Sequence, residues 1–265
     1  MSATGAAAGL QRSPGFAVAA RLGHAVNGLL HLLIGVVAFR LATGGGGSAD
    51  QSGALGSIAG SPGGRVLLWV VVVGLLGLGL WQLVETVLAR GEDAKRTWAA
   101  RAKELGKAVA YLAIAATALR FATGGSSDSS EQTQSLSARL LAAPGGVVLL
   151  VILGLAVVAV GVYFGFKGAT KRFQDDISVP AGSLGRGITA LGIAGYVAKG
   201  VALVAVGVLF VVGAVTADPS RATGLDGALQ SLAGLPAGVA VLAITGLGLI
   251  AYGLYCGARA RYAKL

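Results

Sequence analysis

Hydrophobic residues in this chain occur in long continuous runs rather than in alternation with polar ones. Six runs approach or exceed the ~20 residues that an apolar helix needs to cross a bilayer. They lie at about 21–42, 64–86, 105–123, 145–166, 195–216 and 236–258. Continuous runs of this kind favour helices over barrel strands, whose apolar residues would alternate. The pattern therefore predicts six transmembrane helices.

The six runs form pairs, and the pair is repeated three times. A proline opens the second run of each pair, at Pro62, Pro144 and Pro236, and an aromatic residue follows nineteen positions later, at Trp81, Tyr163 and Tyr255. Repetition in register indicates an architecture built from copies of one unit. We predict an all-α integral membrane protein whose three tandem two-helix repeats, 21–90, 103–174 and 188–260, form a pseudo-threefold bundle after a cytoplasmic tail of residues 1–20.

Each proline is preceded by a short leucine-bearing segment with apolar residues three or four apart, Leu55 and Ile58, Leu136 and Leu140, and Leu229 and Leu232. We expect three short helices that lie at the outer membrane surface or cap the bundle. The proline that follows is expected in the first turn of the next span, where its missing N–H is not needed.

Composition supports the membrane assignment. The chain is 55% hydrophobic and 12% charged, and its mean hydropathy is +0.77. Soluble domains are usually ~45–50% apolar and ~25% charged. A soluble fold of this length could not bury so much apolar surface.

The basic residues are distributed unequally between the two sides that six spans would create. Sixteen lie on the side of the termini and of the loops after the second and fourth spans, against five on the other side. The positive-inside rule then places both termini in the cytoplasm of a cell-membrane protein. The net charge of +10 follows from this topology. Because no RNA- or DNA-binding module accompanies it, we expect no nucleic-acid partner.

The first span carries the only two histidines, His24 and His31, with Asn27 on the same helical face. Seven residues separate the histidines by ~10.5 Å along the axis, too far to share one metal ion. Two interpretations stay open: a ligand whose partners come from elsewhere, or packed and hydrogen-bonded histidines. We predict no metal and no cofactor.

Glycine is dense in the second helix of each repeat. Gly161 and Gly165, and Gly253 and Gly257, show the small-xxx-small spacing at matching repeat positions. That spacing lets helix backbones approach closely in lipid, so it predicts tight packing of the second helices of repeats 2 and 3.

A set of polar residues recurs near the cytoplasmic ends of the spans. It consists of Asn27, Lys107 and Lys199 in the first helices and Glu85, Lys167 and Arg259 in the second. We predict that the six form a cytoplasmic-side polar ring with a net charge of +3. Such a ring would attract an anionic solute or the head group of an anionic lipid. The alternative is that the long basic side chains snorkel to the interface and only enforce topology.

Signatures of catalysis are missing from the sequence. A lone cysteine, Cys256, lies inside the last apolar run, so one chain can form neither a disulfide nor a thiolate cluster. No zinc-protease, nucleophile-elbow or phosphate-loop motif occurs. We predict that the protein is not an enzyme.

The repeated pattern, with "ARLGHAVNGLLHLLIGVVAFRLATGG" in the first unit and "LGIAGYVAKGVALVAVGVLFVVGA" in the third, resembles the domain of unknown function 1206 family. The resemblance covers about residues 20–261, and "GYVAKG" is its most specific part. It implies a bacterial membrane protein with three two-helix units. It implies no activity and no functional residues.

Two functional hypotheses follow. The favoured one is a non-enzymatic membrane scaffold or subunit that binds a partner protein or an anionic lipid. The alternative is a small anion or solute transporter or channel, with a path along the pseudo-threefold axis and the polar ring as its inner selectivity element.

Overall fold

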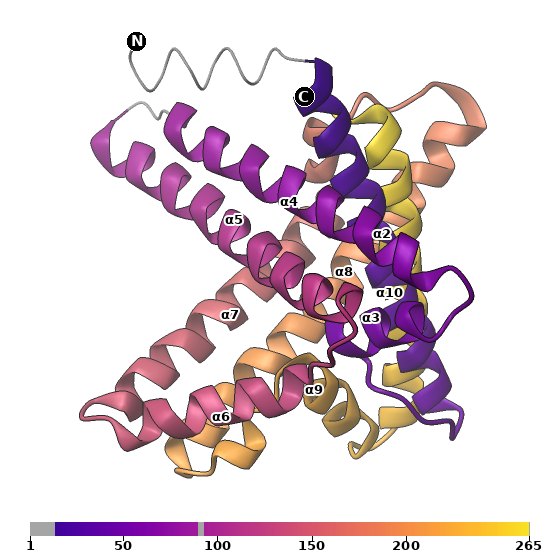
Figure 1. The fold of residues 1–265 in the computed structure, drawn as a ribbon. Coiled ribbons are helices and arrows are strands. Elements are labelled where there is room, and N and C mark those ends of the chain that lie inside the picture. Colours follow the sequence, from indigo (N-terminus) through magenta and orange to yellow (C-terminus); the bar gives the residue numbers. More distant parts are fainter. Residues whose placement is uncertain (1–13, 90–92, 265) are drawn as a thin grey trace. The chain divides into compact units, whose positions relative to one another are not determined.

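The computed structural model describes residues 14–89 and 93–264. The first thirteen residues of the predicted tail, and residue 90 at the end of the first predicted repeat, fall outside this description. The described chain is built from helices (Figure 1). In order they are α2 (Pro14–Ala42), α3 (Gln51–Ala59), α4 (Gly64–Leu88), α5 (Ala94–Ala122), α6 (Ser129–Ala142), α7 (Gly146–Ala169), η1 (Arg172–Asp176), α8 (Gly182–Val215), η2 (Pro219–Arg221), α9 (Gly224–Ala233) and α10 (Gly238–Tyr262).

Six of these helices are long and apolar enough to span a bilayer, as predicted: α2, α4, α5, α7, α8 and α10. The largest difference from prediction is at the starts of α5 and α8, which begin at Ala94 and Gly182 rather than near 105 and 195. The extra turns of α5 are polar but rich in good helix formers, and Asp93 caps them by accepting a 2.7 Å hydrogen bond from the Arg96 N–H. Hydrophobicity marks where a span enters lipid, whereas helix propensity and capping decide where the helix begins.

The three expected short helices are present as α3, α6 and α9. The prolines after them, however, lie outside the following helices rather than in their first turns. In each case the residue after the proline takes a left-handed conformation before the span begins, with φ of 73° at Gly63, 75° at Gly145 and 58° at Ala237. The sharp turn at this point needs positive φ, which glycine adopts at little cost and alanine does not.

The chain divides into two compact units that do not coincide with the repeats. Unit 1 takes in the described residues up to Gly28, Leu55–Ser126, and the described residues from Cys256 onward. Unit 2 consists of Leu29–Ala54 and Ser127–Tyr255. Each is described by itself.

In unit 1, α4 packs against α5 and against the first half of α2. A methyl group on Gly79 of α4 would meet the Leu112 side chain of α5 at 2.8 Å. A methyl on Gly23 of α2 would fall 2.5 Å from the Gly74 carbonyl oxygen of α4. Trp81 of α4 is buried, as are Ala108 and Ala115 of α5. The lack of side chains at Gly23 and Gly79 therefore sets how closely the helices approach.

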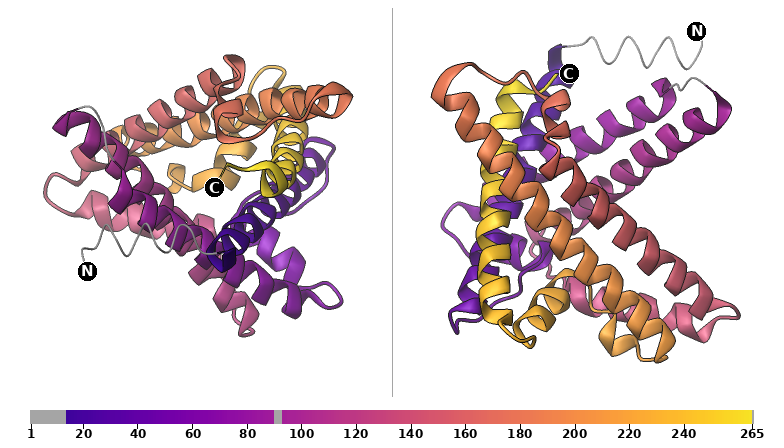
Figure 2. Two further views of the ribbon diagram at one scale, coloured as in Figure 1. Left: turned by 90° about the horizontal axis from the view of Figure 1, so that it is seen from above. Right: turned by 180° about the vertical axis from the view of Figure 1, so that it is seen from behind.

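In unit 2, α7 and α8 run antiparallel and contact each other through glycines spaced seven residues apart. The two helices lie side by side in both views of Figure 2. A methyl on Gly154 would meet the Gly207 carbonyl oxygen at 2.8 Å, and a methyl on Gly161 would meet that of Gly200 at the same distance. About two turns beyond Gly161, a methyl on Gly168 would lie 3.2 Å from the Ile193 carbonyl oxygen. Backbone therefore contacts backbone along three levels of this junction.

The same junction recurs between repeats 3 and 1. A methyl on Gly246 of α10 would meet the Gly35 carbonyl oxygen of α2 at 2.9 Å, and these two glycines are the repeat counterparts of Gly154 and Gly207. The second helix of one repeat thus packs on the first helix of another through equivalent positions. The small-xxx-small pair of α7 takes part in this packing, because a methyl on Gly200 would lie 2.7 Å from the Gly161 carbonyl oxygen and 2.8 Å from the Gly165 nitrogen. Methyl groups on Gly165 and Gly257 themselves would have nothing within 4 Å, so the glycines whose own methyls would clash along α7 are spaced seven residues apart.

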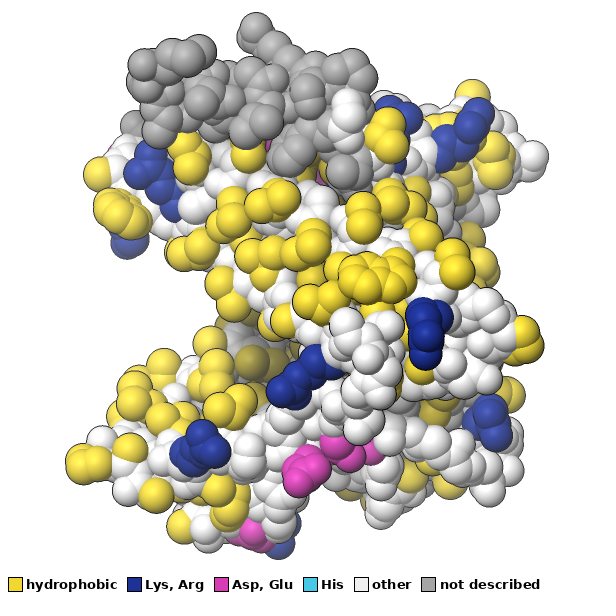
Figure 3. Space-filling view, in the orientation of Figure 1, with side chains coloured by type: hydrophobic (Ala, Val, Ile, Leu, Met, Phe, Trp, Pro, Cys, Tyr) yellow, Lys and Arg dark blue, Asp and Glu magenta, His cyan; other side chains and the backbone are white. Residues whose placement is uncertain are grey.

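Large apolar side chains cover the outside of the spans. Hydrophobic side chains are spread over much of the face drawn in Figure 3, where Lys and Arg are scattered and acidic residues are few. On α4 the exposed apolar residues include Val66, Trp69, Val73 and Leu80, and on α7 they include Val148, Ile152 and Leu155. Exposed apolar surface on this scale is stable in lipid and not in water.

Candidate functional site

Four of the six predicted ring residues lie in unit 1. Asn27 is buried, and its Nδ2 donates to the Cys256 Sγ at 3.5 Å. The Lys107 ammonium pairs with Glu104 on the same helix, with 2.7 Å between Nζ and Oε2, and lies within electrostatic range of Arg259. Glu85 is half-buried on α4. The sequence did not single out Glu104, although a carboxylate three residues before a lysine is the standard signal for a helical ion pair.

The other two ring residues lie in unit 2 against aromatic rings. Lys167 forms an ion pair with Asp176 of η1, with 2.5 Å between Nζ and Oδ2. Lys199 places its ammonium 4.4 Å from the centre of the Tyr252 ring and 5.1 Å from that of Phe164. The rings belong to a larger cluster in which Tyr196, Phe173 and Tyr255 also stack or meet edge to face. Aromatic faces and a carboxylate thus stabilise both charges within the protein.

The two histidines differ in environment. His24 is buried in unit 1, whereas the ring of His31 packs on Tyr252 in unit 2 with centroids 4.7 Å apart. Among the described residues, no group of three or more His, Cys, Asp or Glu side chains is arranged to hold a metal ion. The polar ring itself stays a prediction, because its members fall in different units.

A second feature of unit 2 was not foreseen from the sequence. An apolar groove of about 520 Å³ runs along α7 and α8 to α9. Its floor is formed by small residues, Gly161 and Gly165 of α7 and Gly200 of α8, and its walls by valines and leucines such as Val197, Val204, Val208 and Leu235. The groove exists because Gly165 carries no side chain where a methyl group would point into open space.

The α8 wall of this groove continues toward the start of the helix. Arg186, Ala190 and Ile193 line a second hollow of about 500 Å³, and Val197, Val201, Val204 and Val208 line the groove. These positions are three or four residues apart, so they form one stripe on one face of α8. Arg186 is exposed and lies ~16 Å along the helix from Val197. A cationic side chain therefore shares a face with an apolar channel.

Comparison with known proteins places the chain in a family. The family model described as Domain of Unknown Function (DUF1206) matches three tandem regions, residues 22–89, 103–171 and 194–263. This chain is a member of the DUF1206 family. The three matches confirm the three predicted repeats and the resemblance noted above.

Among DUF1206-like proteins, the chain is 34% identical over 242 residues to "Uncharacterized protein YxxB" of Bacillus subtilis (strain 168), covering 89% of this chain and 86% of that protein. No solved structure matches the chain. The family assignment establishes an all-α protein with three tandem repeats and six candidate membrane spans, and the function has to be argued from the geometry.

Proposed function

We propose that this DUF1206 protein is a non-enzymatic component of the cell membrane, with both termini in the cytoplasm, that binds an anionic phospholipid on unit 2. One acyl chain lies in the α7–α8 groove, and the phosphate lies near Arg186. The main support for this proposal is the groove, an apolar channel that the protein's own side chains do not fill. It lies on two helices that are each long and apolar enough to span the bilayer.

The groove suits hydrocarbon in shape and chemistry. The stripe of α8 from Arg186 through Ala190 and Ile193 to Val197 is ~16 Å long at the helical rise. Half of a ~30 Å hydrocarbon core is ~15 Å, so the end of an acyl chain anchored near Arg186 reaches the groove at Val197 and Gly165. An ordered chain in the groove gains dispersion contacts on several sides that it lacks in bulk lipid.

Arg186 supplies the preference for negative charge. It lies on the same stripe of α8 as the groove, toward the end of the helix that positive-inside topology assigns to the cytoplasm. Its guanidinium can bind a phosphate through two parallel hydrogen bonds. Thr189 lines the same hollow and adds a hydroxyl beside the head group.

The test is retention of lipid by the purified protein in native mass spectrometry, after titration with phosphatidylglycerol or phosphatidylcholine. We expect Gly165→Leu to abolish the tightly held lipid by filling the groove. Gly257→Leu is the matched control, since that glycine also has open space around it but does not line the groove. We expect Arg186→Gln to retain lipid and lose the preference for phosphatidylglycerol.

Equal lipid retention by Gly165→Leu and the wild type would overturn the acyl-chain site. An unchanged preference in Arg186→Gln would overturn the head-group site alone.

A further inference from the structure

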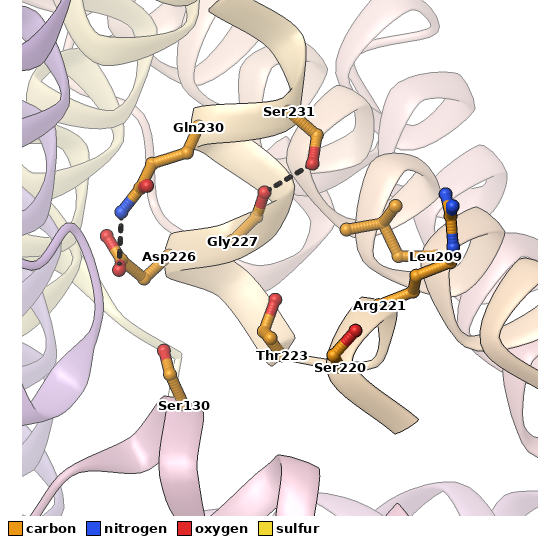
Figure 4. A pocket seen from close by; sticks show the side chains of 9 residues that line it. All are labelled: Ser130, Leu209, Ser220, Arg221, Thr223, Asp226, Gly227, Gln230 and Ser231. Carbon is orange, nitrogen blue, oxygen red and sulfur yellow. Dashed lines mark hydrogen bonds between the residues drawn. The ribbon is translucent and has the colours of Figure 1, made fainter. Parts of the chain in front are cut away.

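Unit 2 contains a polar pocket at the end of α8 that is far from Arg186. Its volume is about 500 Å³, and it is lined by residues of η2, α9 and the first turn of α6, with Leu209 of α8 on one side. Figure 4 shows Asp226 and Gln230 on α9, with Ser130 below Asp226 and Arg221 at the far edge. A pocket of this size is in the range that holds a small organic molecule.

Segments from all three repeats meet beside this pocket. The Ala49 N–H, from the first repeat, donates to Asp226 Oδ1 of the third repeat at 2.7 Å. Ser52 Oγ of the first repeat lies 2.5 Å from Ser129 Oγ of the second. Gln230 Nε2 donates to Asp226 Oδ2 at 2.8 Å, which fixes the carboxylate. These hydrogen bonds hold the segments around the pocket in fixed positions relative to one another.

Three carboxylates lie near one another in this region, and one of them, Asp226, lines the pocket. Asp226 is only 8% exposed and Asp50 only 2%, and Asp128, which is exposed, caps α6 within electrostatic range of Asp50. Among the described residues, none of the three forms an ion pair. Their hydrogen-bond donors are neutral: backbone N–H groups and the Gln230 amide. Burying negative charge with neutral donors alone is costly, and a positive ligand removes that cost.

The nearest cation in the pocket does not neutralise this charge. Arg221 pairs with Asp218, with 3.2 Å between Nε and Oδ2, and over half of its side chain is exposed. That pair is neutral in sum and lies at the rim. Asp226 is therefore the carboxylate that lines the pocket and forms no ion pair among the described residues.

A hydroxyl of the pocket also lacks a partner. Ser130 Oγ is enclosed, and no hydrogen-bond partner for it exists in the described structure. Figure 4 shows this side chain on the side of the pocket that holds Asp226. A buried hydroxyl without a partner is unfavourable. An N–H donor held beside Asp226 would supply the missing bond.

We propose that this pocket binds a small organic ammonium ion, whose N–H groups donate to the Asp226 carboxylate and the Ser130 hydroxyl. A bare metal ion fits less well, because the volume is large and no described group of three acidic, His or Cys side chains is placed to coordinate one. The proposed topology puts the pocket on the outer side of the membrane. The pocket shares Leu209 and Ser231 with the lipid groove, but Asp226 and Ser130, on which this proposal rests, do not line the groove.

The experiment is isothermal titration calorimetry of the full-length protein in nanodiscs with 1,4-diaminobutane. The control ligand is the neutral analogue 1,4-butanediol, which has the same chain length and carries hydroxyl groups in place of the ammonium groups. We expect saturable binding of the diamine, at least tenfold weaker binding of the diol, and weaker diamine binding at high salt. No binding of the diamine, or equal binding of the diol, would refute the proposal.

Two variants and one control locate the site. Asp226→Asn keeps an acceptor for the Ala49 N–H and removes the charge, so we expect a loss of tenfold or more in diamine affinity. Asp218→Asn is the matched control at the rim and is expected to change affinity less than threefold. Ser130→Ala removes only the hydroxyl and keeps the proposal testable if Asp226→Asn fails to fold. Unchanged affinity in a folded Asp226→Asn protein, or in Ser130→Ala, would contradict the assignment.

Discussion

The α7–α8 and α4–α5 junctions occupy equivalent places in the repeats and are filled differently. Between α7 and α8, glycines meet the partner's backbone at three levels. Between α4 and α5, the counterparts of Gly154, Gly200 and Gly207 are Val72, Ala108 and Ala115, and Gly79 faces the flexible Leu112 side chain. One register of helix pairing thus accommodates a backbone-to-backbone contact in unit 2 and a side-chain contact in unit 1. The difference predicts unequal sensitivity to added methyl groups.

The units can be followed separately by spectroscopy. All three tryptophans, Trp69, Trp81 and Trp98, belong to unit 1. Tryptophan fluorescence therefore reports unit 1, and far-UV circular dichroism reports helices of both units.

The largest effect is expected from Gly161→Ala in the α7–α8 junction. The new methyl would lie 2.8 Å from the Gly200 carbonyl oxygen, and backbone cannot move aside cheaply. We expect a loss of ~1–3 kcal/mol in unfolding free energy, seen as a lower circular-dichroism midpoint in detergent. The control Gly165→Ala, four residues along the same helix, has open space and should be neutral or stabilising. Equal loss in both variants would show that general loss of glycine, and not the close approach, is responsible.

A loss of ~1 kcal/mol or somewhat more is expected from Ala115→Gly in α5. Ala115 is 1% exposed, and the change costs helix propensity as well as a buried methyl. Glycine is the residue that repeat 3 carries at this place, Gly207. The tryptophan-detected midpoint should fall. A rise would mean that α4 and α5 move closer and adopt the packing of the α7–α8 junction.

A smaller effect, below ~1 kcal/mol, is expected from Gly79→Ala. Its methyl would lie 2.8 Å from Cδ2 and 2.9 Å from Cγ of Leu112, a side chain that can change rotamer, and alanine improves helix propensity. The tryptophan-detected midpoint should change less than the circular-dichroism midpoint changes in Gly161→Ala. An equal or larger change would contradict the expected difference in sensitivity to an added methyl group between the α4–α5 and α7–α8 junctions.

The smallest effect is expected from pH, and it should act on unit 2. Burial raises the pKa of Asp50 above its usual 3.8, and the nearby Asp226 and Asp128 raise it further against the opposing Gly53 hydrogen bond. Because the folded pKa is the higher one, Asp50 favours folding most below pH 3.8, and this contribution is lost as the pH rises through the folded value.

Asp50→Asn keeps an acceptor for the Gly53 N–H and removes the charge. It should therefore be more stable than the wild type near pH 7, with the difference shrinking toward pH 4 in circular-dichroism melts. Tryptophan-detected melts should not follow this trend. A difference that does not vary with pH would rule out Asp50 ionisation as its cause.

The spans and repeats were predictable because lipid imposes them. Every helix in a bilayer must satisfy its own backbone and present apolar side chains, so runs such as 145–166 are visible without a structure. Helix starts were predicted less well, since the polar turns of α5 after Asp93 depend on capping and propensity rather than on lipid. Pro62 and its counterparts marked the turn but not its φ > 0 residue.

The polar sites were harder to predict because they depend on which helix faces which. The sequence placed Lys167 and Lys199 at one level, but their aromatic neighbours on α7, α8 and α10 follow from side-chain packing. Asp50, Asp128 and Asp226 went unnoticed, although Asp128 directly before the leucine-bearing segment of α6 was a capping signal. The groove at Gly165 was missed because a glycine that opens space and one that closes a contact look alike in sequence.

The contact between Gly35 and Gly246 has a consequence for biosynthesis. These residues are 211 positions apart in the chain, and translation at ~5–20 residues per second separates their emergence from the ribosome by roughly 10–40 s. During that interval the nascent α2 resides in the bilayer without α10. A growing chain of this kind offers an insertase or chaperone a glycine-lined helix face that the finished protein covers.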